Sequence, residues 1–131
     1  MATLITSPWS TGRRFSVKVE NISAEQTKLT ASDGAAYDFF GYSVAVSGDG
    51  STAVIGACYD YAGGNQSGSA YVFTRSGSSW TQQAKLTASD GAARDYFGCS
   101  VAVSGDGSTA VIGAYSDYDR VVLVGSAYIF V

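Results

Sequence analysis

Hydrophobic residues alternate with small or polar residues along most of this chain, in short runs separated by turn residues. In SVAVSGDGSTAVIGA (43–57), Val44 and Val46 alternate with small residues, Asp49-Gly50 supplies a tight turn, and residues 53–55 form the returning run. Asp-Gly between two such runs is a strong short-range signal for a β-hairpin. The small residues in both arms are typical of strands buried against neighbouring sheets, so we expect this hairpin to form the inner half of a sheet.

Two further strands are predicted after a polar loop. GSAYVFTRSG (68–77) places Tyr71 and Phe73 on one face and Val72 on the other. SSWTQQAKLTAS (78–89) also alternates, and its half-polar pattern is typical of an outer edge strand. We expect one face of that strand to carry Trp80, Gln82, Ala84 and Leu86, and the other to carry Thr81, Gln83, Lys85 and Thr87. Four antiparallel strands connected in sequence are the pattern of one β-propeller blade.

This unit occurs twice in tandem. Residues 28–74 align with 85–131 without a gap at a period of 57, and 34 of these 47 positions are identical. We therefore divide the chain into a lead (1–27), a first repeat (28–84) and a second repeat (85–131) that has no counterpart of the fourth strand. The predicted fold class is all-β, with antiparallel four-stranded propeller-type blades in two tandem repeats that form an incomplete propeller.

The lead carries strand patterns of its own. SAEQTKLTAS (23–32) matches the fourth-strand sequence WTQQAKLTAS (80–89), and RRFSVKVEN (13–21) predicts a further strand that could serve as an edge or docking arm. The lead thus carries a fourth-strand sequence that its own repeat does not use, and the second repeat lacks one. This arrangement favours strand exchange, in which the lead supplies the fourth strand of a second repeat. The lead would close the second blade of its own chain or the blade of the next copy. Head-to-tail association, a two-sheet domain and a fragment of a longer polypeptide stay open.

The motifs also resemble a known family. DFFGYSVAVSGDG, AVIGA and GSAYVF (38–73) return as DYFGCSVAVSGDG, AVIGA and GSAYIF (95–130). These resemble FG-GAP repeats, the propeller blades of integrin α-chains and of many bacterial and algal surface proteins. Phe-Gly stands at 40–41 and 97–98, and the Gly-Ala-Pro element at 56–58 and 113–115 has lost its proline both times. The resemblance covers about residues 24–131 and implies a propeller with a role in recognition or adhesion.

The acidic residues limit what the resemblance implies about calcium. Many integrin-type blades hold calcium in a D-x-D-x-D-G loop, whereas the corresponding SGDGST loops contain one carboxylate each, Asp49 or Asp106. We expect both to form turns, so this calcium site is not transferred. Other acids gather in loops, where turn formation and bonds to backbone N–H groups are the main expectation and a weak calcium site is the alternative. They are Asp33, Asp38, Asp60, Asp90, Asp95 and Asp117, with Asp119 beside them.

Two further groups of residues are candidates for binding. Tyrosines that flank the loops would lie on one rim of a propeller, where a flat ring with a polar tip suits a sugar or a protein. They are Tyr37, Tyr59, Tyr61, Tyr96, Tyr115 and Tyr118. AGGNQS (62–67) is replaced in the second repeat by DRVVLV (119–124), and an exposed apolar run of this kind favours a contact surface for another chain. The run consists of Val121, Val122, Leu123 and Val124.

Charge and composition exclude several function classes. The net charge is −3 and no basic run could follow a phosphate backbone, so we expect no nucleic-acid partner. No apolar stretch approaches the roughly 18 residues of a spanning helix. The chain has no histidine, so no imidazole base is present and the enzymatic alternative is a carboxylate pair of the glycosidase kind.

Cys58 and Cys99 occupy different repeat positions, and either ordinary thiols or a disulfide between the repeats fits them.

The sequence says less about compartment. The start lacks the apolar core of a secretory signal, and it is rich in Ser, Thr and Arg and free of acids through Val19, so an organelle stays open beside a surface location. Asn21 and Asn65 lie in Asn-x-Ser sequons. We expect a non-catalytic structural or recognition module, without a cofactor, that acts in a surface or extracellular assembly or in adhesion. A carbohydrate-binding propeller is the alternative, and a carboxylate-pair enzyme ranks third.

Overall fold

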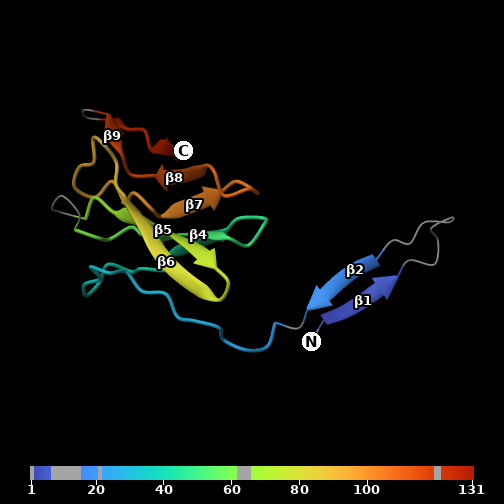
Figure 1. Ribbon diagram of the computed structural model, residues 1–131. Coiled ribbons are helices and arrows are strands. Elements are labelled where there is room, and N and C mark those ends of the chain that lie inside the picture. Colours follow the sequence, from blue (N-terminus) through green and yellow to red (C-terminus); the bar gives the residue numbers. More distant parts are fainter. Residues whose placement is uncertain (1, 7–15, 21, 62–65, 120–121) are drawn as a thin grey trace.

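In a computed structural model, the residues described are 2–6, 16–20, 22–61, 66–119 and 122–131. They contain β-strands, turns and extended segments and no helix (Figure 1). The first repeat forms a four-stranded antiparallel sheet in the order β3 (Ser43–Val46), β4 (Thr52–Ala57), β5 (Ser69–Ser76) and β6 (Ser79–Leu86). The second repeat forms a three-stranded antiparallel sheet in the order β11 (Ser126–Phe130), β8 (Ala110–Ala114) and β7 (Ser100–Val103).

Two small hairpins accompany these sheets. β1 (Ala2–Thr6) pairs with β2 (Ser16–Glu20), and β9 (Tyr118–Asp119) pairs with β10 (Val122–Leu123). The strand expected in residues 13–21 is therefore present over Ser16–Glu20. The part of the chain that the structure describes contains no helix that is both long and apolar enough to cross a membrane.

Sequence chemistry accounts for the central hairpin of each repeat. In the first turn, Oδ1 of Asp49 accepts hydrogen bonds from the Ser47 hydroxyl at 2.6 Å and from the Ser51 backbone N–H at 3.0 Å. Gly50 then takes a positive φ of 72°, which glycine adopts without steric cost. Asp106 accepts the equivalent bonds in the second repeat. Both aspartates are therefore turn formers, as the sequence predicts.

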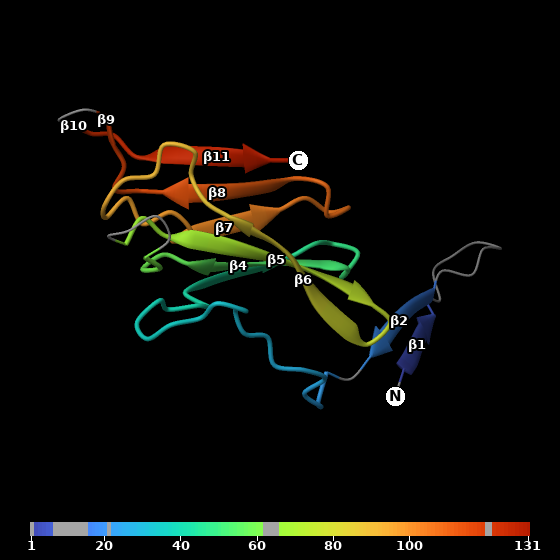
Figure 2. The same cartoon turned by 60° about the vertical axis from the view of Figure 1, so that its left-hand side comes forward.

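The two sheets stack face to face (Figure 2). β3 of the first sheet contacts β7 of the second. A hydrophobic cluster fills the space between them, with Val54 and Ala70 from the first sheet and Phe97 and Ile112 from the second repeat all fully buried. A second cluster lies on the opposite face of the first sheet, and the side chains packed against it are Leu29, Ala31, Phe40 and Trp80. Burial of this apolar surface is the main favourable contribution to folding.

The repeat symmetry shows how the sheets are oriented. Ile55, Tyr71 and Phe73 form the second cluster, and their counterparts at 112, 128 and 130 belong to the cluster between the sheets. Equivalent residues therefore line the outer face of the first sheet and the face of the second sheet that packs against the first. The two sheets have the same orientation in the stack. Successive sheets stacked in one direction are the arrangement of propeller blades. The fold class expected from the sequence, all-β with two tandem blades, is confirmed.

Close backbone contacts join the two blades. The Phe97 N–H donates to the Ser67 carbonyl at 2.9 Å, and the Ser43 hydroxyl donates to the Gly98 carbonyl at 2.7 Å. At Gly56, an added Cβ would lie 1.9 Å from the Gly98 carbonyl oxygen. The glycines of the two motifs thus allow neighbouring blades to approach at backbone distance.

Strict alternation along β6 is interrupted, which corrects one expectation. The β5–β6 register shifts between Val72 and Phe73, so that Val72 pairs with Ala84 but Phe73 pairs with Gln82. The extra residue on β6 forms a β-bulge. A bulge reverses the faces of the side chains on one side of it relative to those on the other. Trp80 therefore packs against the second cluster and Leu86 against the cluster between the sheets. The prediction that these two side chains share a face is wrong.

The spare fourth-strand sequence does not form a strand in this structure. No residue of 22–32 belongs to a strand, while Leu29 and Ala31 pack against the outer face of the first sheet. Within the described residues, β11 pairs with β8 and with no other strand. The lead therefore does not close the second blade of its own chain.

Candidate functional site

The loops that carry the Phe-Gly motifs have an unusual backbone. Phe39 and Tyr96, which occupy the same repeat position, have φ values of 56° and 58°. This left-handed region costs a non-glycine residue on the order of 1 kcal/mol and is frequent at functional sites. A buried aspartate supports each loop, since Asp38 accepts from the Ala35 N–H at 2.9 Å and Asp95 from the Ala92 N–H at 2.6 Å. Burial raises the pKa of Asp95.

These loops contribute to a continuous row of aromatic rings, which we call the aromatic rim. Its members are Phe39, Tyr42, Tyr59, Tyr96 and Tyr115. The ring centroids of Tyr59 and Tyr96 are 5.0 Å apart, and those of Tyr96 and Tyr115 are 5.6 Å apart in a stacked arrangement. Phe39, Tyr42 and Tyr115 are each more than half exposed. The rim is thus an ordered aromatic surface that spans both blades.

The structure brings together only some of the tyrosines expected from the sequence. Tyr59, Tyr96 and Tyr115 belong to the rim, whereas Tyr37 and Tyr61 are exposed and make no ring contact with it among the described residues. The side chain of Tyr118 lies outside the described part of the structure. Sequence reasoning missed Phe39 and Tyr42. The alignment of Phe39 with Tyr96 in the repeat was the available signal for the first of them.

Lys85 joins two of the candidate acids in the first repeat. Its Nζ lies 2.8 Å from Oδ2 of Asp60 and also bonds Asp33. The Tyr71 hydroxyl lies 2.7 Å from Asp33 Oδ1 and 3.1 Å from Asp60 Oδ2. Hydrogen bonding to Lys85 is the main cause that lowers the pKa of Asp33. Burial alone would raise the pKa of Asp60, but the bond to Lys85 holds it below its usual value.

The second repeat contains the same cluster without the lysine. The Tyr128 hydroxyl lies 2.8 Å from Asp90 Oδ1 and 3.2 Å from Asp117 Oδ2, and Ser126 donates to Asp117. Burial, followed by Asp90, raises the pKa of Tyr128. Outside the gaps at 62–65 and 120–121, no lysine or arginine of residues 22–131 forms an ion pair with either acid. Two carboxylates therefore face one tyrosine, and no cation from the part of the chain that the structure describes forms an ion pair with them.

The six candidate calcium ligands are thus divided among four places. Asp38 and Asp95 bond their own loops, Asp33 and Asp60 hold a lysine, and Asp90 and Asp117 flank Tyr128. No three or more Cys, Asp or Glu residues of the described chain converge in a geometry that could hold a metal ion. A calcium ion takes six to eight oxygens, so Asp90 and Asp117 would need further ligands to bind one.

The two cysteines are neighbours across the blade interface. Cys58 is buried, Cys99 is half-buried, and both are free thiols. Burial is the first cause that raises the pKa of each, and for Cys58 the contact with Cys99 adds to it. The structure therefore contains two free thiols that contact each other across the repeats.

The apolar run of the second repeat is exposed. Val122, Leu123 and Val124 have exposed fractions of 58%, 53% and 59%, and the first two form β10. Val121, Asn21 and Asn65, which the sequence also singles out, lie outside the described residues.

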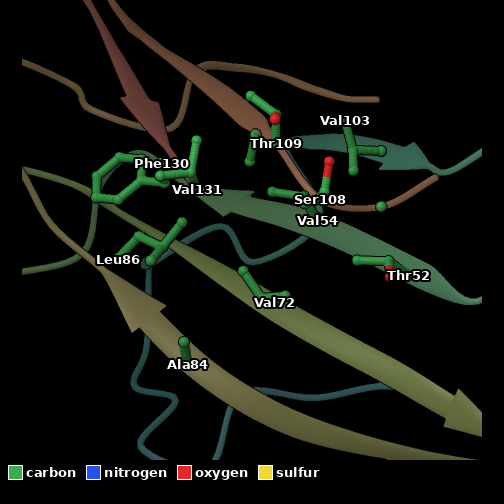
Figure 3. A pocket seen from close by; sticks show the side chains of 12 residues that line it. Thr52, Val54, Val72, Ala84, Leu86, Val103, Ser108, Thr109, Phe130 and Val131 are labelled. Carbon is green, nitrogen blue, oxygen red and sulfur yellow. The ribbon is translucent and has the colours of Figure 1, made fainter. Parts of the chain in front are cut away.

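One apolar cavity of about 190 Å³ lies between the blades (Figure 3). Val72, Ala84 and Leu86 line it from the first sheet, and Phe130 and Val131 from the second repeat. The polar residues among those that line it are Thr52, Ser108 and Thr109, and no Asp or Glu side chain is among them. A carboxylate-pair enzyme needs two facing acids, and this cavity does not present them.

Comparison with known proteins agrees with the geometry. The profile of the FG-GAP repeat matches residues 24–73 and 80–130. The first match ends within β5, and the second begins within β6, the last strand of the first blade. A search of curated proteins found none that matches the chain. The matched segments cover most of the chain, and each contains a Phe-Gly loop and strands of the sheet that follows it. The two sheets stack as blades do. The chain belongs to the FG-GAP repeat family.

Proposed function

We propose that this protein is a non-catalytic recognition module of a surface or extracellular assembly, and that it binds a protein partner through the aromatic rim. FG-GAP repeats form β-propeller-type modules that commonly serve recognition and adhesion. The proposal adds to this family role a binding surface and a class of partner.

The single observation that supports the proposal most directly is the row of rings across both blades, three of which are more than half exposed. Aromatic side chains are enriched in protein interfaces because they bury a large area with few rotatable bonds. The rim rings pack against one another at centroid distances of 5.0–6.3 Å, so little side-chain freedom remains to be lost on binding. The left-handed residues Phe39 and Tyr96 hold their rings there at a cost in backbone energy.

A second candidate function is carbohydrate binding. Tyr42 and Tyr115 are each more than half exposed, and exposed tyrosine rings stack on the apolar faces of sugars while their hydroxyls bond sugar oxygens. The rim would then contact a glycan rather than a polypeptide.

Binding of the labelled protein to intact cells of its source tests the proposal. Wild type should bind saturably, and a double variant Tyr96→Ser/Tyr115→Ser should bind at least about tenfold more weakly, since central interface aromatics each contribute about 2 kcal/mol. Tyr37→Ser is the matched control, because Tyr37 is 78% exposed and makes no ring contact with the rim among the described residues. It should bind like wild type.

Two treatments separate the partners. Mild protease treatment of the cells should abolish binding if the partner is a protein, whereas periodate oxidation of the cell-surface glycans should leave it intact. Loss of binding after periodate alone would favour the carbohydrate alternative. Equal binding of wild type and the double variant would overturn the role of the rim.

A further inference from the structure

We propose that the outer edge of β11 accepts residues 24–29 of a second copy of this chain as a fourth strand, and that Lys28 of that copy binds Asp90 and Asp117. This inference deepens the proposed role in an assembly and rests on it. The acceptor edge, the charge, the donor and the cavity each support it.

The acceptor is the outer edge of β11, which has no paired strand among the described residues. β11 is the repeat counterpart of β5, and β5 pairs with strands on both sides, whereas β11 pairs with β8 alone in the described structure. An unpaired edge presents backbone N–H and C=O groups to an incoming strand. The outward face of this blade is also uncovered, since Ile129 is 72% exposed and Val111 is 38% exposed, while Val54, the counterpart of Val111, is fully buried.

Charge complementarity identifies a lysine on the incoming strand. In the first blade, Lys85 of the fourth strand lies between Asp33 and Asp60 beside Tyr71. In the second blade, the counterparts Asp90, Asp117 and Tyr128 have the same mutual geometry but no described lysine. Two carboxylates near one another favour a cation between them, so the second cluster is a preformed place for an ammonium group.

The lead of a second copy carries that lysine in the right sequence. AEQTKL (24–29) is the counterpart of TQQAKL (81–86), with Lys28 in the place of Lys85 and Leu29 in the place of Leu86. Lys28 is exposed and its segment belongs to no sheet in this structure.

The donor segment can pair with another copy without losing its packing against its own first blade. Leu86 pairs with Ala70 of its own blade and also packs in the cluster with the following blade. Leu29 already packs against a following blade as Leu86 does, because it contacts the first blade of its own chain. The segment can therefore keep this contact while its backbone pairs with β11 of another copy.

The observed register of β6 on β5, moved by one repeat, predicts the intermolecular pairs. Ala70 pairs with Leu86, Tyr71 with Lys85 and Val72 with Ala84. The corresponding pairs are Ala127 with Leu29, Tyr128 with Lys28, and Ile129 with Thr27. This register places Lys28 opposite Tyr128, beside which both acids lie.

The cavity between the blades offers space for a side chain of the incoming strand. In the first repeat, Trp80 of the fourth strand packs in the same cluster as Phe73. In the second repeat, Phe130 is the counterpart of Phe73 and lines the cavity of about 190 Å³ (Figure 3). In the proposed register, Ser23 takes the place of Trp80. A Ser23→Trp variant should then fill this space and strengthen association.

The mass of the 131-residue chain in solution tests the proposal, measured by light scattering from about 1 to 100 µM, the range of weak specific interfaces. Wild type should form species of two or more chains as concentration rises. Lys28→Glu and Asp90→Lys should each weaken association at least about tenfold, as expected for loss of a desolvated charge pair. The double variant Lys28→Glu/Asp90→Lys should recover most of it, and Ser23→Trp should tighten it.

Arg94→Glu is the matched control, because it makes the same charge reversal at an exposed residue outside the proposed register and should associate like wild type. A folded wild-type chain that stays monomeric at the highest concentration would overturn the proposal. So would association that Lys28→Glu leaves unchanged, or association that a calcium chelator abolishes, since a metal ion and not a lysine would then neutralise the acids.

Failure of this inference can be told apart from failure of the proposed function. The Lys28→Glu variant retains all five rings of the aromatic rim. If that variant is monomeric and still binds cells through the rim, recognition does not depend on self-association. If wild type associates as proposed but Tyr96→Ser/Tyr115→Ser binds cells unchanged, the assembly stands and the rim proposal fails.

Discussion

Lys85 Nζ lies 2.8 Å from Oδ2 of Asp60, and this pair ties the last strand of the first blade to the loop that follows its second strand. Both side chains are mostly buried, with exposed fractions of 27% and 10%. The pair crosses the sheet over Tyr71, whose hydroxyl shares the same carboxylate. The contact therefore joins the outer part of the blade to its core.

We expect Lys85→Met to lower the free energy of unfolding by about 2 kcal/mol, because it leaves the buried carboxylate of Asp60 without this ammonium group. Solvent near the exposed part of the pair keeps the loss below that of a fully buried one. Urea unfolding at low protein concentration measures it. Lys28→Met, the same change at the repeat counterpart, should alter stability by less than about 0.5 kcal/mol. Equal losses in the two variants would contradict the assignment.

Acid should destabilise the first blade in a defined window. Asp33 and Asp60 have folded-state pKa values below 3.8, so their contribution to stability is present above that pH and is lost as the pH falls through the folded values. Stability should thus decline as pH drops below 3.8. Asp33→Asn should flatten this decline, because one fewer proton is taken up on unfolding. Urea titrations from pH 5 to pH 2.5 compare the slopes, and parallel curves would refute the prediction.

The two Phe-Gly glycines should respond differently to alanine. Gly41 and Gly98 have nearly the same φ, 94° and 95°, but an added Cβ at Gly98 would lie 2.2 Å from the Ser69 carbonyl oxygen while Gly41 has open space. We expect Gly98→Ala to cost about 3 kcal/mol or more through strain and blade separation, and Gly41→Ala only about 1 kcal/mol through strain. Thermal unfolding of the two variants tests this difference. Similar losses would show that the backbone contact contributes nothing.

Oxidation should join the two blades through Cys58 and Cys99. Each thiol gives up a hydrogen to an added oxidant such as diamide, and the mass of the chain falls by about 2 Da as the S–S bond forms. The bond closes a loop across the repeats, so stability should rise by up to about 4 kcal/mol. Intact-mass analysis and unfolding of the oxidised monomer measure both effects. Cys58→Ser should show neither, and a link between chains in place of the internal one would contradict the arrangement.

The sequence predicts the strands of the first blade but not all of the side-chain faces. Alternation, Asp-Gly turns and the 57-residue period were enough to predict the four strands of the first blade, because these signals are local or repeated. They could not predict the faces of Trp80 and Leu86. A β-bulge shifts the register between them, and that shift depends on how β6 pairs with β5 rather than on the sequence of β6 itself.

The roles of some candidate residues follow from the sequence, and those of others follow only from the tertiary structure. The sequence alone determined that Asp49 and Asp106 form turns and that the chain carries two FG-GAP repeats, because these properties depend on neighbouring residues and on the repeat. Only the tertiary structure decided that Tyr59, Tyr96 and Tyr115 meet in one rim with Phe39 and Tyr42, and that Lys85 takes the place between Asp33 and Asp60. The physical reason is that these groups lie on different strands and loops, so their separation is set by how two sheets stack.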